Sequence, residues 1–213
     1  MERNIEEYFG KWEDKPEVKK GNFGERIVKD YLEKEGYVVY TTKSIGSHLC
    51  DGFVSNKNKK EIFIGDVKSK ARRNIYPDTG IDEKYYNNYK ELSMKYNMPF
   101  FLYFIDEGMK KIYGNRLDVL EIERTILYEY DNGKGKESFP ITYPSPKIDS
   151  KGNNIVYFPL CCMKEMNNIT SEDVEILKDL SRRSIEYKPN QNEKITIIDS
   201  KIKEEINKVF YMI

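Results

Sequence analysis

The chain has 213 residues, which is enough for one domain with a substantial hydrophobic core. Its 36 basic and 36 acidic residues cancel, which excludes a protein that binds polyanions through its overall field, so any basic surface has to be local. Three cysteines, of which Cys161 and Cys162 are adjacent, form no CxxC pair, which argues against zinc and iron–sulfur sites and indicates a reducing compartment. The amino terminus has no apolar leader and no stretch is long enough to span a membrane, so we expect a soluble cytoplasmic protein.

The first elements alternate between helix and strand. Residues 1–20 are polar and predict an arm or a short helix. A helix is predicted from Asn22, as its N-cap, to a stop at Gly36. Its apolar residues recur at helical spacing: Phe23, Ile27, Val28, Tyr31 and Leu32. The β-branched and aromatic residues of 37–42 predict a strand.

A hairpin and a second helix are predicted next. After a loop at 43–48, the apolar runs 49–54 and 61–68 flank the turn-like SNKNKK and indicate a hairpin. A polar loop at 71–80 then leads to a helix that ends before Pro99 and whose apolar face is formed by Ile81, Tyr85, Tyr89, Leu92 and Tyr96. The almost wholly apolar run 99–105 predicts a strand in the middle of a sheet that is covered on both sides.

The second half of the chain gives a weaker pattern. Residues 154–160 predict a strand and 170–184 a helix that begins with a capping box formed by Thr170 and Asp173. The segment 131–153 is a long loop or hairpin, and 195–199 and 202–213 predict a last strand and helix. The whole order of elements favours an α/β fold with a mixed sheet flanked by helices.

Charged residues end the otherwise apolar strand of the hairpin. Asp66 and Lys68 share one face of this strand because side chains alternate across a strand. With the turn centred near Asn58 and Lys59, Asp51 lies opposite or diagonal to Asp66. Two carboxylates a few ångströms apart repel each other unless a cation joins them, and Mg²⁺ is often held by only one or two carboxylates.

Such a metal ion has a direct use on nucleic acid. It polarises a phosphate oxygen and lowers the pKa of a bound water, while a nearby lysine orients or deprotonates that water. Glu25 lies on the margin of the buried stripe of the first helix, from which it can face the sheet.

At these residues the chain resembles the PD-(D/E)xK nuclease superfamily, which has the restriction-endonuclease-like fold, and in particular archaeal Holliday-junction resolvases. The resemblance is carried by Glu25 in GNFGERIV, Asp51 in HLCDG and the triplet Asp66, Val67, Lys68 in IGDVKSK. It covers residues 21–106, which divides the chain into an arm (1–20), a nuclease-like core (21–106) and a C-terminal α+β extension (107–213). The chain departs from the superfamily pattern in one position, because Cys50 and not proline precedes Asp51.

The resemblance implies a role for each of these residues. Asp51 and Asp66 bind Mg²⁺, or Mn²⁺, with help from the backbone carbonyl of Val67, while Lys68 serves catalysis and Glu25 is an accessory acid. It also implies a DNA substrate and, for many members, a homodimer. The pattern then predicts a Mg²⁺-dependent nuclease that hydrolyses phosphodiester bonds of DNA.

Two further groups are candidates for contacts with DNA. The cations Lys70, Arg72 and Arg73 follow Lys68 directly and form a local basic patch that can bind phosphates. On the second helix Tyr89, with Tyr85 and Asn88 as alternatives, can approach the site, although Tyr85 and Tyr89 also fit a place in the core.

Each feature has a structural alternative. Asp66 and Lys68 can form an ordinary ion pair, Asp51 before Gly52 can belong to a turn, and Glu25 can be a solvated residue of the first helical turn. The alternative functions are accordingly a catalytically inactive module of the same fold that binds nucleic acid or protein, and a scaffold protein.

Overall fold

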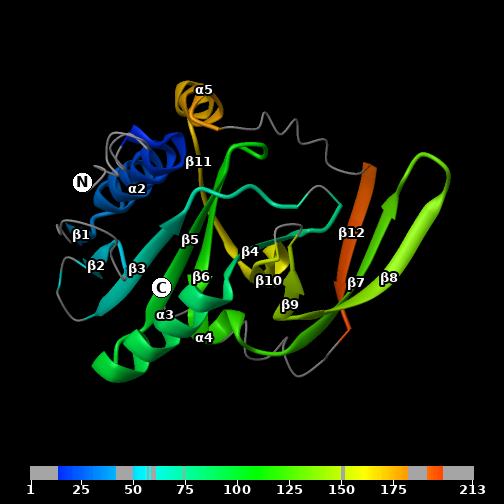
Figure 1. Ribbon diagram of the computed structural model, residues 1–213, viewed down its shortest axis with the longest axis horizontal. Coiled ribbons are helices and arrows are strands. Elements are labelled where there is room, and N and C mark those ends of the chain that lie inside the picture. Colours follow the sequence, from blue (N-terminus) through cyan, green and yellow to red (C-terminus); the bar gives the residue numbers. More distant parts are fainter. Residues whose placement is uncertain are drawn as a thin grey trace, which may run out of the picture.

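A six-stranded mixed sheet lies at the centre of the computed structural model, which describes residues 14–41, 50–56, 58, 61–73, 75–149, 152–181 and 191–198. The strand order is β1-β2-β3-β5-β6-β11. Helices lie on both faces of this sheet (Figure 1). The predicted fold class, α/β with a central mixed sheet flanked by helices, is confirmed.

Helix α2 (Pro16–Lys34) covers one face of the sheet. It begins earlier than predicted, because Lys15 is the N-cap and Pro16, with its fixed φ angle, occupies the first turn, so that the prediction of Asn22 as N-cap is wrong. Its end is as expected, since Gly36 adopts a φ of 89°, which glycine accepts at little cost. The helix buries Gly24, Ile27, Val28 and Leu32 against the sheet.

Three consecutive antiparallel strands follow α2. They are β1 (Val38–Thr41), β2 (Gly52–Ser55) and β3 (Ile62–Lys68), and both the predicted strand and the predicted hairpin are confirmed. The predicted loop at 43–48 lies outside the described residues. Strand β3 then pairs in parallel with β5 (Phe100–Asp106), the fully buried centre of the sheet.

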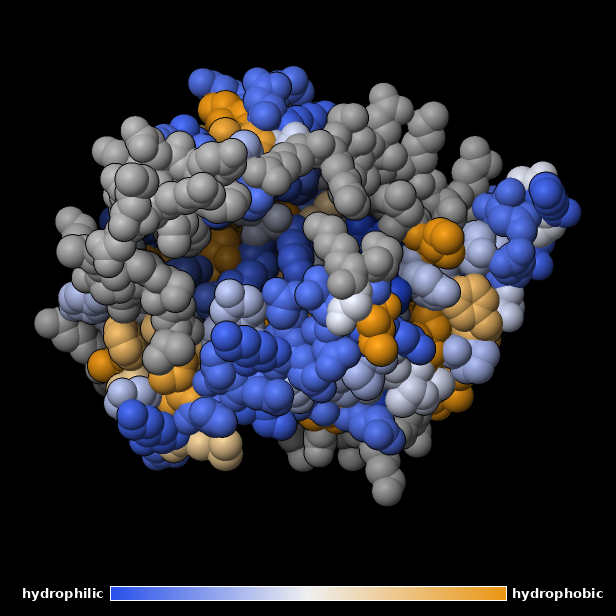
Figure 2. All heavy atoms as spheres, viewed as in Figure 1, coloured by the Kyte–Doolittle hydropathy of each residue, from blue (hydrophilic) through white to orange (hydrophobic). Residues whose placement is uncertain are grey.

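The crossover between β3 and β5 differs from the prediction in part. Asp78–Asp82 form strand β4, so Ile81 belongs to a strand and the predicted loop is shorter. Helix α3 (Glu83–Tyr96) follows and ends at Asn97, which has a left-handed conformation. Of its tyrosines only Tyr89 is buried, and the exposed side of α3 is mostly hydrophilic (Figure 2).

Apolar residues form a cluster on each face of the sheet. On the α2 face, Ile27, Val28 and Leu32 pack with the β5 residues Phe101, Tyr103 and Ile105. On the α3 face, Tyr89 packs with the other β5 residues Phe100, Leu102 and Phe104. The alternation along β5 therefore supplies both cores.

The sheet continues beyond Asp106. Strand β6 (Lys111–Arg116) pairs with β5, and β11 (Lys164–Asn168) forms the edge. Along the chain, α4 (Leu117–Leu120) directly follows β6, and the 3₁₀ helix η2 (Leu160–Cys162) comes shortly before β11. Helix α5 (Ser171–Asp179) packs beside α2, and its predicted capping box is confirmed by the bond from the Asp173 N–H to the Thr170 hydroxyl.

Two smaller sheets complete the described fold. One has the order β4-β10-β9, with β9 at Ser145–Ile148 and β10 at Asn154–Pro159. The other has the order β12-β7-β8, with β7 at Arg124–Asp131, β8 at Lys136–Tyr143 and β12 at Gln191–Ile197, and projects from one side of the molecule (Figure 1). The strands predicted near 154–160 and 195–199 are thus confirmed, whereas the predicted helix 202–213 lies outside the described residues. None of the described helices is long and apolar enough to cross a membrane.

Candidate active site

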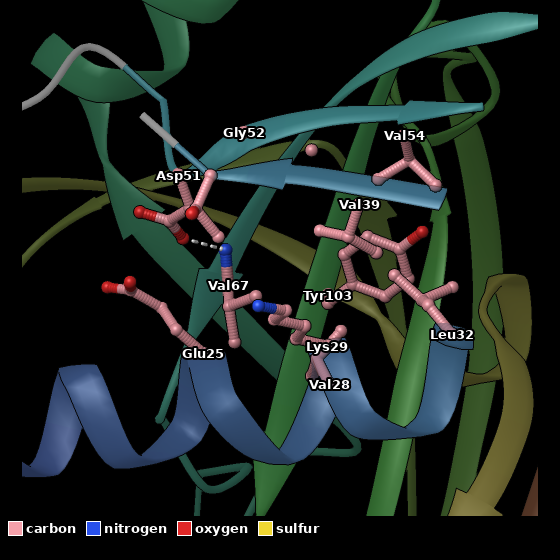
Figure 3. Close-up of a pocket in the computed structure, with 12 residues that line it drawn as sticks. Glu25, Val28, Lys29, Leu32, Val39, Asp51, Gly52, Val54, Val67 and Tyr103 are labelled. Carbon is pink, nitrogen blue, oxygen red and sulfur yellow. Dashed lines mark hydrogen bonds between the residues drawn. The ribbon is translucent and has the colours of Figure 1, made fainter. Parts of the chain in front are cut away.

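Carboxyl groups from a helix and two strands meet where the β2–β3 hairpin opens. Asp51 directly precedes β2, and because Gly52 pairs with Gly65 the register places Asp51 opposite Asp66. Glu25 is half-buried on the side of α2 that faces the sheet, and it lines a small pocket of about 40 Å³ together with Asp51 (Figure 3). Glu25 lies well inside α2, so the alternative of a first-turn residue is excluded.

Asp51 is held by the end of β3. The Val67 N–H donates a hydrogen bond of 2.6 Å to Asp51 Oδ2. Burial raises the pKa of Asp51 to about 8, and the neighbouring carboxylates of Asp66 and Glu25 add to this effect. The Val67 N–H and the Lys68 ammonium oppose it without reversing it. The charged form of Asp51 is therefore disfavoured first by burial and then by the neighbouring carboxylates.

Strand geometry also indicates which side the carbonyl of Val67 faces. In a β-strand the N–H and C=O of one residue face the same neighbouring strand, and the Val67 N–H faces the side of Asp51. The ladder between β2 and β3 ends at the pair Gly52 and Gly65, so β2 has no paired residue opposite Val67. The Val67 carbonyl is therefore expected on the same side of β3 as Asp51.

Asp66 is almost fully buried, with 3% of its surface exposed. The Lys68 ammonium lies 2.7 Å from Asp66 Oδ2, and both Lys68 and Tyr89 hydrogen-bond to this carboxylate. Burial raises the pKa of Asp66, and these two partners only partly offset this effect. The ion pair predicted as the structural alternative is therefore present, yet it does not fully compensate the burial of the carboxylate.

Lys68 lies between Asp66 and the aromatic rings of α3. Burial acts to lower the pKa of Lys68, but the carboxylates of Asp66 and Asp51 outweigh it and the net shift is upward. Its ammonium lies 5.2 Å from the ring centre of Tyr85 and 5.6 Å from that of Tyr89. Lys68 therefore carries a proton at neutral pH, and its position is fixed from two sides.

These residues fit a hard divalent cation. The described residues contain no group of three or more His, Cys, Asp and Glu side chains placed to hold a metal ion. Mg²⁺, however, needs only one or two carboxylates and completes its coordination with water and substrate phosphate. Asp51, Asp66 and the Val67 carbonyl would supply only oxygen ligands, which Mg²⁺ prefers, and a cation would stabilise the charged form of these two carboxyl groups, whose pKa values are raised by burial.

The predicted basic patch is smaller than the sequence indicated. Arg72 is buried and forms a two-pronged ion pair with Glu193 of β12, at 2.9 Å and 2.7 Å. Arg73 forms a second one with the buried Asp78, at 2.6 Å and 2.5 Å. Their side chains therefore hold the crossover in place, and of the three predicted phosphate contacts only Lys70 presents an exposed side chain.

Tyr89 lies in the core, which corrects its prediction as a substrate contact. It is 1% exposed and its ring stacks on Phe100, with 4.4 Å between the ring centres. Burial, together with the adjacent Asp66 carboxylate, raises the pKa of its hydroxyl. Tyr89 thus contacts Asp66 from the core, whereas Tyr85, its predicted alternative, is 40% exposed.

Two features that position the site were not predicted. A Cβ atom at Gly24 would lie 2.0 Å from the Ser69 hydroxyl oxygen, so a larger residue there would require Ser69 to rotate and give up its hydrogen bond to the Lys20 carbonyl. The Lys20 ammonium and the Glu107 carboxylate form a largely buried ion pair of 2.5 Å between α2 and the segment after β5. Gly24, a glycine in the interior of the predicted helix, was the signal in the sequence for this close approach.

Comparisons with known proteins give a distant structural likeness. Neither a protein-family model nor a curated protein matches the chain. Among solved structures the chain is similar to Hjc, a Holliday junction resolvase from the archaeal hyperthermophile Archaeoglobus fulgidus, with a TM-score of 0.40 and 13% identity over 58% of this chain and 88% of that chain. A likeness of this size carries no argument about activity, so function has to be argued from the residues of the site.

Proposed function

We propose that the protein is a metal-dependent nuclease that hydrolyses phosphodiester bonds of DNA. The observation that carries this proposal is the meeting of Asp51 and Asp66, two buried carboxyl groups at the open end of one hairpin whose pKa values are both raised, chiefly by burial, beside an ammonium. Burying such a pair destabilises the fold unless a cation compensates it. Binding of a metal ion by the pair would account for this loss of stability.

Each residue has a role in this proposal. Asp51 and Asp66 would hold Mg²⁺ or Mn²⁺ with the Val67 carbonyl, and the ion would supply charge neutralisation at the phosphate and a more acidic bound water. Glu25, on the opposite side of Asp51 from the hairpin, would accept a hydrogen bond from a water molecule and orient it.

Lys68 would act with its proton in place. Because Asp66 and Asp51 raise its pKa, the residue is an ammonium that can contact a phosphate oxygen and stabilise the charge that develops there. It would therefore stabilise charge, and the proton of the attacking water would pass to the Glu25 carboxylate that orients this water.

Incubation of the purified protein with linear, circular and branched DNA, with RNA in parallel, tests the proposal in Mg²⁺, in Mn²⁺ and in EDTA. We expect cleavage in either metal and none in EDTA, and we expect Asp66→Asn to be inactive. Asp131→Asn, which removes a carboxylate from the distant β7–β8 hairpin, is the matched control and should cleave like wild type.

Two outcomes contradict the proposal. If the wild type and Asp66→Asn degrade DNA equally, the activity comes from a contaminant. If no nucleic acid is cleaved but DNA is bound without uptake of metal, the chain is an inactive binding module of the same fold. Titration of Mn²⁺ by calorimetry into wild type and Asp51→Ala separates these readings, since only a functional metal site binds Mn²⁺ in an Asp51-dependent way.

A further inference from the structure

Three aromatic rings form a stack from the core to the surface next to Lys68. Phe100 of β5 stacks on Tyr89 with 4.4 Å between centres and an interplanar angle of 19°. Tyr89 stacks in turn on Tyr85, with 6.3 Å between centres and an angle of 25°. The first two side chains are each 1% exposed and Tyr85 is 40% exposed, so the stack ends at the surface.

The outer ring of this stack lies at the candidate site. The Lys68 ammonium is 5.2 Å from the centre of the Tyr85 ring, and Lys68 also contacts Asp66. Tyr85 stands in the first turn of α3, and its ring is supported by Tyr89, which fixes its orientation before any ligand arrives. The exposed Lys70 follows Lys68 and adds a cation beside the same surface.

This combination has the chemistry of a single-strand binding platform. Exposed aromatic rings beside cations bind unpaired nucleotides, because each base can stack on a ring while its phosphate contacts the charge. Bases in an intact duplex are already stacked and paired, and would have to be extruded first. The adjacent cation also favours phosphate close to the ring.

We propose that Tyr85 stacks on an unpaired base next to the phosphate held at Lys68, so that the substrate is a nucleic acid with a single-stranded segment at the cleavage point. The position of the cleavage point rests on the proposed nuclease function, whereas the binding of the unpaired base needs no metal. A fully paired duplex is then bound more weakly than a single strand or a branched DNA with unpaired nucleotides.

Binding of fluorescein-labelled oligothymidine and of a blunt duplex, each measured by fluorescence anisotropy in EDTA, tests the inference without any cleavage. We expect wild type to favour the single strand and Tyr85→Ala to lose about tenfold or more of this affinity, with duplex binding unchanged. Tyr85→Phe, which keeps the ring, should bind like wild type. Tyr96→Ala removes a tyrosine of similar exposure (49%) at the other end of α3 and is the matched control.

The inference is overturned if Tyr85→Ala binds oligothymidine as wild type does, if it loses single-strand and duplex affinity equally, or if Tyr96→Ala has the same effect. Its failure is distinct from failure of the nuclease proposal. A protein that binds single strands through Tyr85 but cleaves no nucleic acid contradicts the nuclease proposal alone. A protein that cleaves in Mg²⁺ with an Asp66-dependent site, yet has no single-strand preference that depends on Tyr85, contradicts the platform alone.

Discussion

The backbone N–H of Val67 donates a hydrogen bond of 2.6 Å to the Asp51 carboxylate, which fixes the residue before β2 against the end of β3. This bond holds Asp51 in a place where burial and the nearby Asp66 and Glu25 raise its pKa from 3.8 to about 8. The position of Asp51 therefore disfavours its charged form, and a measurement of stability can detect this cost.

Asp51→Asn should stabilise the metal-free protein at neutral pH. A raised pKa means that the contribution of Asp51 to stability is fully present below about pH 4 and is lost as the pH rises through about 8. Asparagine can still accept from the Val67 N–H and does not ionise. We expect chemical denaturation in EDTA to give a gain of about 1–3 kcal/mol at pH 8, and little difference near pH 4.

Mg²⁺ should stabilise the wild type but not Asp51→Asn. An ion that binds the folded state alone raises its stability by mass action, so millimolar Mg²⁺ should raise the melting temperature of wild type and leave Asp51→Asn unchanged. Asp131→Asn, on the distant hairpin, should respond like wild type. An equal response of Asp51→Asn to Mg²⁺ would place the binding site elsewhere.

Gly24→Ala should disturb the contact between α2 and the end of β3, while Gly21→Ala should not. The added Cβ of the first variant would meet the Ser69 hydroxyl oxygen at 2.0 Å and Ile105 Cδ1 at 3.1 Å, so that Ser69 has to rotate and loses its hydrogen bond to the Lys20 carbonyl. The Cβ of the second meets no atom within 4 Å and should raise helix stability by roughly 0.5–1 kcal/mol. Thermal unfolding and Mn²⁺ affinity of both proteins provide the measurement, and equal behaviour of the two would show that the close approach is not needed.

Lys68→Met should separate binding from turnover. The substitution keeps much of the side-chain length but removes the ammonium that lies 2.7 Å from Asp66 Oδ2. Loss of a group that stabilises developing charge lowers kcat by about 10²–10³, whereas KM should change by less than about tenfold because other groups also contact the substrate. A normal kcat with a greatly raised KM would make Lys68 a binding residue only.

Arg73→Ala should lower the stability of the fold, whereas Lys70→Ala should weaken DNA binding. Removing Arg73 leaves Asp78, which is 0% exposed, without its two-pronged partner and should cost about 3–5 kcal/mol. Lys70 is exposed, so its removal should leave stability within about 0.5 kcal/mol and weaken DNA binding with a smaller salt dependence. Urea denaturation and salt-dependent anisotropy measure the two quantities, and a stable Arg73→Ala that binds DNA weakly would restore Arg73 as a phosphate contact.

The central part of the fold could be predicted because its signals are local. Alternation and turn residues specify the β2–β3 hairpin, and an uninterrupted apolar run specifies β5. The prediction was wrong where a short stretch fits both a helix and a strand. Ile81 fits the spacing of the α3 stripe, but its pairing with Val156 of β10 places it in β4, and no local pattern announces a partner so distant in the sequence.

Some residues of the candidate site could be predicted from local sequence and others could not. The register of one hairpin is sufficient to bring Asp51 to Asp66, so their approach could be deduced from turn length. The partners of Arg72 and Arg73 could not, because a cation in a sequence carries no sign of whether it contacts solvent, substrate or a carboxylate far along the chain. Tyr85 and Tyr89 share a helical face, yet only the depth of α3 in the fold decides which one is buried.

The pairing of Arg72 with Glu193 also bears on synthesis of the protein. The two residues are separated by 121 positions, and Arg72 lies four residues after Lys68. A chain emerging from the ribosome can form the bond from the Arg72 N–H to Asp106 once β5 is made, but it gains the Glu193 carboxylate only when β12 has been made. The stretch after Lys68 would consequently reach its final anchoring only after residue 193 has been translated.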